Sequence, residues 1–124
     1  MIVLVDTSVW IEYLRSGAAA ESERLDSLLA HDQAAVTWPV VTELIRGVRS
    51  KRERQNLEAL FGALPLLEVT ADDWVAAGEN LAKLQVRGVT LPTLDALIAA
   101  VAARNKVQVL TNDRHFDHLN VARF

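Results

Sequence analysis

Short apolar runs rich in β-branched residues, separated by longer helix-like segments, most constrain the fold of this chain. The first run, Ile2–Val5, is continuous, as expected of a central strand that is covered on both faces. Similar runs lie at 34–37, 66–69 and 107–110. This alternation predicts an α/β fold with a mostly parallel sheet.

Apolar residues at helical spacing predict that the segments between the runs are helices. Helices are expected from Thr7 to about Gly17, over 22–30, from Pro39 to about Val48, over about 57–64, from Thr70 to Leu84, and from Pro92 to about Arg104. Phe116 and Leu119 indicate a further short helical turn, and 121–124 an edge strand. Together with the apolar runs, these segments support the α/β fold.

Several residues receive structural interpretations. Thr70 and Asp73 indicate a capping-box start for a helix whose buried side is expected to hold Trp74, Ala77, Gly78, Leu81 and Leu84. We expect Trp74 in the core, and Trp10 and Trp38 in the core or in an apolar groove. His115 and His118 are expected at the surface, and contact with phosphate is the alternative.

The length of 124 residues predicts a single domain, spanning 1–124, with a real apolar core. The absence of cysteine excludes disulfides, zinc–thiolate sites and thiol nucleophiles. The opening MIVLVD is too short for a signal peptide, and no apolar run has the length of a membrane span. We therefore expect a cytoplasmic protein.

The charge pattern permits a nucleic-acid partner. The formal net charge is -3, which argues mildly against such a partner. Basic residues nevertheless crowd one short stretch: Arg46, Arg49, Lys51, Arg52 and Arg54. These side chains could contact phosphates, and a solvated helix face is the alternative.

Four separated acidic residues carry the functional prediction. Asp6 and Asp113 follow the first and last apolar runs, Glu43 lies within a predicted helix, and Asp95 lies in the first turn of the alanine-rich helix. Helix capping or solvation can explain each alone. Because carboxyl ends of parallel strands share one sheet edge, the four could also meet in one pocket. Such a cluster would need a hard cation, Mg²⁺ or possibly Mn²⁺.

These residues also lie in four ordered motifs, VLVDTSVW, VVTELIRG, LPTLDALIAAVA and VLTNDRHF. The motifs resemble those of the PIN domain, and more narrowly the VapC-like toxins of bacterial toxin–antitoxin pairs. The resemblance spans essentially the whole chain. It implies a three-layer α/β/α sandwich, Mg²⁺-dependent endoribonuclease activity on RNA, homodimerisation and inhibition by a small antitoxin.

The resemblance also implies roles for individual residues. Asp6, Glu43, Asp95 and Asp113 match the catalytic and metal-binding quartet, and Thr7, Ser8 and Thr111 match polar residues beside it. Arg46 is a further candidate for substrate binding. Asp117 has only a variable counterpart in the family, and its part is left open.

Two other functions compete with a nuclease. One is phosphoryl transfer through an aspartyl phosphate on Asp6, but Ser8 stands where that class has a second Asp, and Lys106 precedes its strand. The other is a non-catalytic module with the same fold. For the nuclease, attack by water predicts products with 5′-phosphate and 3′-hydroxyl ends.

Overall fold

A parallel sheet lies at the centre of the computed structural model, which describes residues 1–15 and 20–124. In this part of the chain the strands are β1 (Val3–Val5), β2 (Ala34–Thr37), β3 (Leu66–Leu67) and β4 (Gln108–Leu110). Their order is β3-β2-β1-β4, and all neighbours are parallel. The chain thus builds outward from β1 to β3 and then crosses back to place β4 on the other side of β1. Open α/β sheets bind ligands where the strand order reverses in this way, outside the carboxyl ends of the strands.

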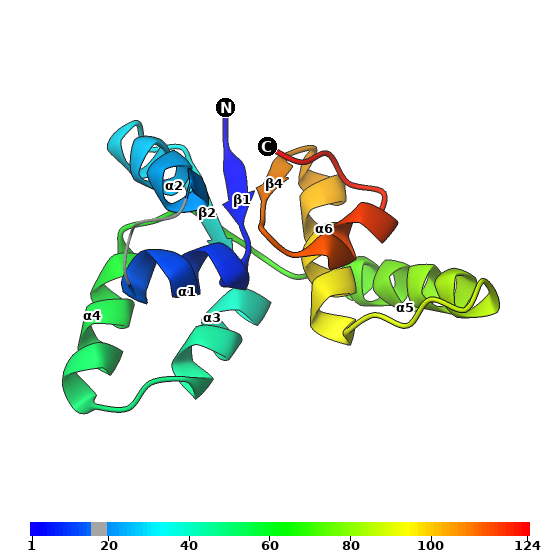
Figure 1. Ribbon diagram of the computed structural model, residues 1–124, viewed down its shortest axis with the longest axis horizontal. Helices are drawn as coiled ribbons and strands as arrows, with labels where there is room; N and C mark the ends of the chain where they lie inside the picture. The colour runs from blue at the N-terminus through cyan, green and yellow to red at the C-terminus, as the bar shows by residue number, and fades with distance from the viewer. Residues whose placement is uncertain (16–19) are drawn as a thin grey trace.

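Helices cover both sides of this sheet. They are α1 (Thr7–Arg15), α2 (Ala20–Ala30), α3 (Trp38–Arg46), α4 (Lys51–Gly62), α5 (Ala71–Val86), α6 (Thr93–Asn105) and the 3₁₀ helix η1 (Arg114–His118). Figure 1 shows α5 and α6 to one side of the strands and α1, α2 and α4 to the other. The predicted three-layer α/β/α fold is confirmed. The predicted helix end at Gly17 lies outside the described residues.

The core is formed by the central strands and by α6. Every residue of β1 is fully buried, as the continuous apolar run predicted. Helix α6 is buried along its whole middle, from Asp95 to Ala102. Its alanines are small enough for neighbouring elements to approach closely on several sides. Asp95 is therefore a carboxylate placed on an otherwise apolar, buried helix.

The buried face of α5 differs from the prediction. The capping box is present, because Thr70 and Asp73 exchange hydrogen bonds between side chain and backbone. Asp73 is itself buried, however, because Arg104 of α6 donates to both of its carboxylate oxygens, at 2.8 and 3.0 Å. The buried stripe consequently runs through Asp73, Ala77 and Leu84, and Trp74 and Gly78 are exposed. The expectation of Trp74 in the core was wrong.

The other two tryptophans differ in environment. Trp10 is fully buried in the core and packs edge-on against Phe61, with ring centroids 5.8 Å apart. Trp38, at the start of α3, is half exposed, and its Nε1 donates a hydrogen bond to Glu68. The core interpretation is therefore confirmed for Trp10 alone.

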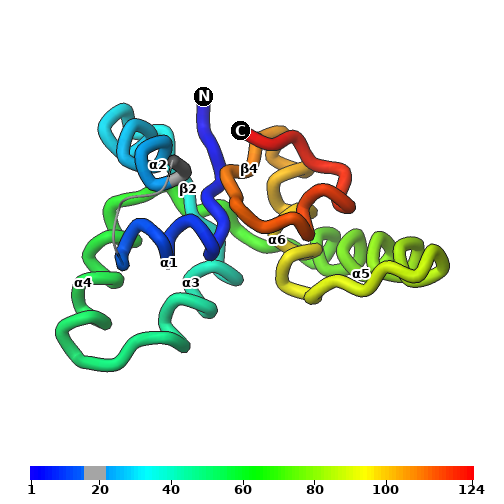
Figure 2. Tube along the Cα trace, viewed as in Figure 1, coloured from blue at the N-terminus to red at the C-terminus, as the bar shows by residue number. Residues whose placement is uncertain are grey.

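The end of the chain runs back along β4. Figure 2 shows that the C-terminus lies near the N-terminus. The predicted edge strand over 121–124 is reduced to a single bridge between Val109 and Arg123. The predicted strand 66–69 is likewise limited to two residues. None of the helices in the described part of the chain is long and apolar enough to span a bilayer.

Candidate metal centre

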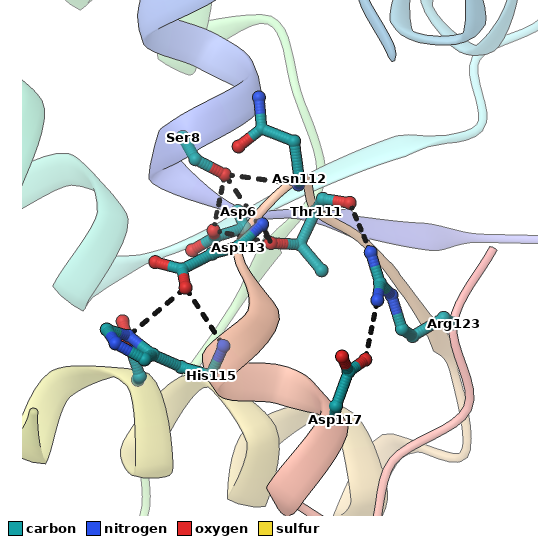
Figure 3. A network of polar contacts seen from close by, with 9 residues as sticks. Asp6, Ser8, Thr111, Asn112, Asp113, His115, Asp117 and Arg123 are labelled. Carbon is teal, nitrogen blue, oxygen red and sulfur yellow. Dashed lines mark hydrogen bonds and ion pairs between the residues drawn. The ribbon is translucent and has the colours of Figure 1, made fainter. Parts of the chain in front are cut away.

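Asp6 occupies the carboxyl end of β1, where the strand order reverses. Its backbone N–H donates to Leu110 O of the neighbouring β4, at 2.9 Å. Its side chain is 2% exposed, and Oδ2 accepts hydrogen bonds from Ser8 Oγ at 2.7 Å and from Thr111 Oγ1 at 2.9 Å (Figure 3). Two of the three predicted polar residues, Ser8 and Thr111, therefore contact Asp6.

Thr111 connects Asp6 to the segment that carries Asp113. The Thr111 hydroxyl oxygen also accepts the backbone N–H of Asp113, at 2.9 Å. Asp113 in turn is the N-cap of η1, and its Oδ1 accepts the backbone N–H of His115 at 2.9 Å. The local explanation of Asp113 as a helix cap is thus correct. The same cap fixes its carboxylate beside the acidic pocket.

His115 lies between two of the predicted carboxylates. Its Nδ1 is 2.7 Å from Asp95 Oδ2 and 3.2 Å from Asp113 Oδ1. Donor atoms of these three residues all lie within 4.8 Å of one another, a spacing that suits a metal ion. His115 is partly exposed, as expected, but its contacts with two carboxylates were not predicted, and His118 is exposed as predicted. The only signal in the sequence was that His115 follows Asp113 by two residues.

Glu43 stands at the side of this group and is linked to it through α1. Thr7 Oγ1 donates a 2.7 Å hydrogen bond to Glu43 Oε1, and Thr7 directly follows Asp6. Glu43 is partly exposed on α3, and Arg46 is exposed one turn later at the end of the same helix. Asp6, Asp95 and Asp113 therefore lie close enough for their charges to interact, whereas Glu43 is linked to them only through Thr7 among the contacts of the described residues.

Asp117 does not join the carboxylate group. Its Oδ1 accepts a 2.7 Å hydrogen bond from the Arg123 guanidinium. The same guanidinium donates to the backbone carbonyl of Thr111, at 2.9 Å (Figure 3). This ion pair ties the end of the chain to the loop after β4. Asp117 therefore contacts the loop after β4 only indirectly, through Arg123.

Burial shifts the protonation of the central carboxylates. It raises the pKa of Asp6, although hydrogen bonds from Ser8 and Thr111 act in the opposite direction. Burial also raises the pKa of Asp95; the hydrogen bond with His115 opposes this shift, and the charges of Asp6 and Asp113 add to it. The hydrogen bond to Asp95 raises the pKa of His115. The hydrogen bonds from Ser8, Thr111 and His115 therefore offset only part of the cost of burying the charges of Asp6 and Asp95.

The chemistry of this donor set fits a divalent cation. Among the ion pairs of residues 1–15 and 20–124, His115 is the only basic partner of these carboxylates. Clustered carboxylates that no arginine or lysine neutralises provide both the charge and the oxygen ligands that a hard cation needs. Asp95, Asp113 and His115 can hold such an ion directly, with Asp6 adjacent. The centre is therefore an acidic cluster able to bind a metal.

A groove lies between α1, α3 and α4. It has a volume of about 520 Å³ and reaches Glu43. Its lining is apolar at Ile11 and Leu14 and carries the basic residues Arg15 and Arg49 at its border. The groove thus offers a partly apolar surface with charges of both signs, and Glu43 is the one predicted carboxylate that lines it.

Comparison with known proteins places this architecture in a family. The profile described as "PIN domain" matches residues 3–122. This chain belongs to the PIN domain family. Similar curated proteins include ribonuclease VapC11 of Mycobacterium tuberculosis, 31% identical over 120 residues that cover 94% of this chain and 90% of the relative. Ribonuclease VapC32 of the same organism is 35% identical over 114 residues, covering 91% and 86% of the two chains.

Solved structures show the same PIN fold. The VapBC-1 structure from nontypeable Haemophilus influenzae superposes with a TM-score of 0.81 at 19% identity, covering 99% of this PIN domain and 96% of that chain. VapBC2 from Rickettsia felis, bound to a DNA fragment from their promoter, gives 0.78 at 20% identity, covering 99% and 96%. At these identities the similarity establishes the fold of the PIN domain.

Proposed function

We propose that this PIN domain is a divalent-metal-dependent endoribonuclease that acts as the toxin of a toxin–antitoxin pair. The observation that carries the proposal is the carboxylate group at the reversal of strand order, in a chain whose relatives are named VapC ribonucleases.

The acidic residues divide into ligands and a positioning group. Asp6, Asp95 and Asp113 would hold Mg²⁺ or Mn²⁺, directly or through water. When bound, the cation supplies activation of water and neutralisation of charge on the phosphate oxygens. Asp6 is kept in one orientation by the hydroxyls of Ser8 and Thr111. A carboxylate that is already fixed loses less conformational entropy when the cation binds, so these hydroxyls raise the affinity of the centre for the cation.

Glu43 has a different position and a different proposed role. The hydroxyl of Thr7 occupies one of its carboxylate oxygens, Oε1, and leaves Oε2 available. We assign Glu43 to orient the attacking water by accepting a hydrogen bond from it, or to complete the ligand set. Attack by water predicts RNA products with 5′-phosphate and 3′-hydroxyl ends.

The basic residues after Glu43 are the proposed RNA contacts. Arg46 is exposed within one turn of Glu43, and Arg49 borders the groove that reaches Glu43. Contacts from such side chains to phosphates position an RNA strand without reading its sequence. Arg54 is less available, because it pairs with Glu58 along α4 at 2.9 Å.

Two protein partners belong to this proposal. The first is a small antitoxin, because several structural relatives are described as VapBC or toxin–antitoxin complexes. The second is another copy of the chain in a homodimer. Helix α5 exposes the apolar side chains Trp74 and Val75 near its start and Val86 at its end, and a second copy could cover them. Light scattering of the purified chain would measure the oligomeric state.

The aspartyl-phosphate alternative finds no support in the arrangement. Such an enzyme needs a lysine near the phosphorylated carboxylate. Lys106 caps the end of α6 and precedes β4, whereas Asp6 follows β1. Because β1 and β4 are parallel, Lys106 lies at the amino ends of these strands and Asp6 lies at their carboxyl ends. Ser8 occupies the position where a second Asp would be needed.

Controlled expression in a bacterium tests both the nuclease and the toxin parts. We expect growth arrest that is relieved by Asp95→Asn and by co-expression of a small adjacent reading frame. RNA isolated from arrested cells should carry new 5′-phosphate ends. Arrest that survives Asp95→Asn would contradict a catalytic origin and would favour a non-catalytic interaction.

A further inference from the structure

His115 is held in the acidic centre by its own short helix. Its backbone N–H is fixed by the cap on Asp113, and the next residue, Phe116, is 1% exposed in the core. These two anchors hold the backbone of His115 beside the carboxylates. Its Nδ1 faces Asp95 and Asp113, while the ring as a whole is partly open to solvent.

The positions of the three donor atoms suit one ion. Ligand atoms at adjacent positions of a six-coordinate ion, bound at about 2.1 Å, lie about 3 Å apart. Nδ1 of His115 is 2.7 Å from Asp95 Oδ2 and 3.2 Å from Asp113 Oδ1. The histidine nitrogen therefore occupies a place in the cluster equivalent to that of a third carboxylate oxygen.

We infer that His115 is a nitrogen ligand of the divalent cation held by Asp95 and Asp113, and that it makes the centre prefer Mn²⁺ to Mg²⁺. This inference rests on the proposed metal-dependent function. Neutral imidazole binds a metal through one ring nitrogen and keeps its hydrogen on the other. A cation bound at Nδ1 would replace the hydrogen in the 2.7 Å contact between Nδ1 and Asp95 Oδ2, and Nε2 would then carry the ring hydrogen.

The preference follows from the chemistry of the donors. Mg²⁺ is a hard ion that favours oxygen ligands and retains several waters. First-row transition ions are softer than Mg²⁺ and accept imidazole nitrogen more readily, with Mn²⁺ the weakest binder among them. Two carboxylates and one imidazole thus favour Mn²⁺ over Mg²⁺, while the carboxylates alone would discriminate much less.

Pulsed electron paramagnetic resonance of the Mn²⁺-loaded protein tests the ligand directly. We expect modulation from a directly bound ¹⁴N nucleus in the wild-type protein. His115→Asn should abolish it, whereas His118→Gln and His31→Gln should retain it, since His118 is exposed on the far end of η1 and His31 bonds Ser27 O on α2. A wild-type spectrum without nitrogen modulation would overturn the inference, and so would modulation that persists in His115→Asn.

Titration calorimetry with Mn²⁺ and with Mg²⁺ tests the preference. His115→Asn should weaken Mn²⁺ binding about 10- to 100-fold and Mg²⁺ binding much less. His115→Asp, which restores an oxygen ligand, should bind both ions and lose the preference for Mn²⁺. Equal losses for the two ions in His115→Asn would overturn the inferred preference.

These readouts separate the inference from the proposed function, because neither needs RNA. Nitrogen modulation in a protein that binds Mn²⁺ but cleaves no RNA would uphold the ligand and refute the nuclease. Metal-dependent cleavage without nitrogen modulation would uphold the nuclease and refute His115 as a ligand. Circular dichroism of each His115 variant confirms that its fold is retained before either result is used.

Discussion

The hydroxyl of Thr111 donates a 2.9 Å hydrogen bond to the buried carboxylate of Asp6, and so joins the ends of two neighbouring strands. The same hydroxyl oxygen accepts the backbone N–H of Asp113. One threonine therefore sets the position of Asp6 relative to the segment that carries Asp113. Because β1 and β4 meet where the strand order reverses, this bond lies at the place where such sheets bind ligands.

Replacing this hydroxyl should affect metal binding more than folding. Thr111→Val keeps the side-chain shape and removes the hydrogen bonds, so we expect a loss of about 1 kcal/mol in the free energy of unfolding. Mn²⁺ affinity should fall about 10-fold, as for other groups that orient metal ligands. Urea denaturation and titration calorimetry measure the two effects.

Thr37→Val is the matched control for that prediction. Thr37 is also a buried threonine at a strand end, but its hydroxyl donates to Leu67 O, away from the carboxylates. Thr37→Val should lose about as much stability as Thr111→Val and keep the wild-type affinity for Mn²⁺. Equal losses of Mn²⁺ affinity in the two variants would refute a specific role for Thr111.

Asp6→Asn should stabilise the metal-free protein at neutral pH. Burial raises the pKa of Asp6 above its ordinary value, so the folded state favours the protonated form. Stability from this group is present below the unfolded pKa and is lost as the pH rises through the folded pKa. Asparagine is neutral at every pH, so its advantage over the wild type should grow as the pH rises.

Thermal melts from pH 4 to pH 8 in the presence of EDTA measure this difference. We expect the melting temperature of Asp6→Asn to exceed that of the wild type at pH 7 and to approach it at pH 4. Added Mn²⁺ should raise the wild-type value by mass action and raise the variant value less. A variant that is less stable than the wild type at pH 7 would contradict the assigned cost of the buried charge.

Asp73 is predicted to serve stability alone. Burial by itself would raise the pKa of Asp73, but the hydrogen bonds from Arg104 and Thr70 outweigh it, and the net shift is downward. Ionised Asp73 therefore stabilises the fold above its ordinary pKa, and this contribution is lost as the pH falls through the lowered value. Asp73→Asn should lower the urea midpoint at pH 7 and have a smaller effect near pH 3.

The neighbouring Asp72 provides the control for Asp73. It lies in the same first turn of α5 but is exposed, so Asp72→Asn should leave the urea midpoint nearly unchanged. Neither variant should alter Mn²⁺ binding, because both residues lie away from the carboxylate group. A loss of Mn²⁺ affinity in Asp73→Asn would show that the two regions are coupled.

The fold and the carboxylates were predictable because their signals are local. A continuous apolar run marks a strand buried on both faces, and a polar residue after it falls at the carboxyl edge of a parallel sheet. Asp6 and Asp113 follow from that reasoning alone. Their assignment as metal ligands stays a prediction, as does that of Glu43 and Asp95.

Two features were not predictable because distant residues determine them. The buried face of α5 is rotated toward Asp73 because Arg104, 31 positions later, binds that carboxylate. The direction of His115 depends on a short 3₁₀ helix, which the sequence marks weakly, and on Asp95, 20 positions earlier. Hydrophobic spacing carries no information about either pairing, since both are made by polar side chains across the fold.

Cleavage of a labelled RNA by the purified protein tests the central claim most directly. We expect cleavage with Mg²⁺ or Mn²⁺, none with EDTA, and products with 5′-phosphate ends. Asp6→Asn should abolish cleavage while its circular dichroism and melting temperature show an intact fold. Asp117→Asn is the matched control, because Asp117 pairs with Arg123 outside the carboxylate group, and it should retain cleavage. Cleavage that persists in EDTA, or in Asp6→Asn at the wild-type rate, would contradict a metal-dependent nuclease at this centre.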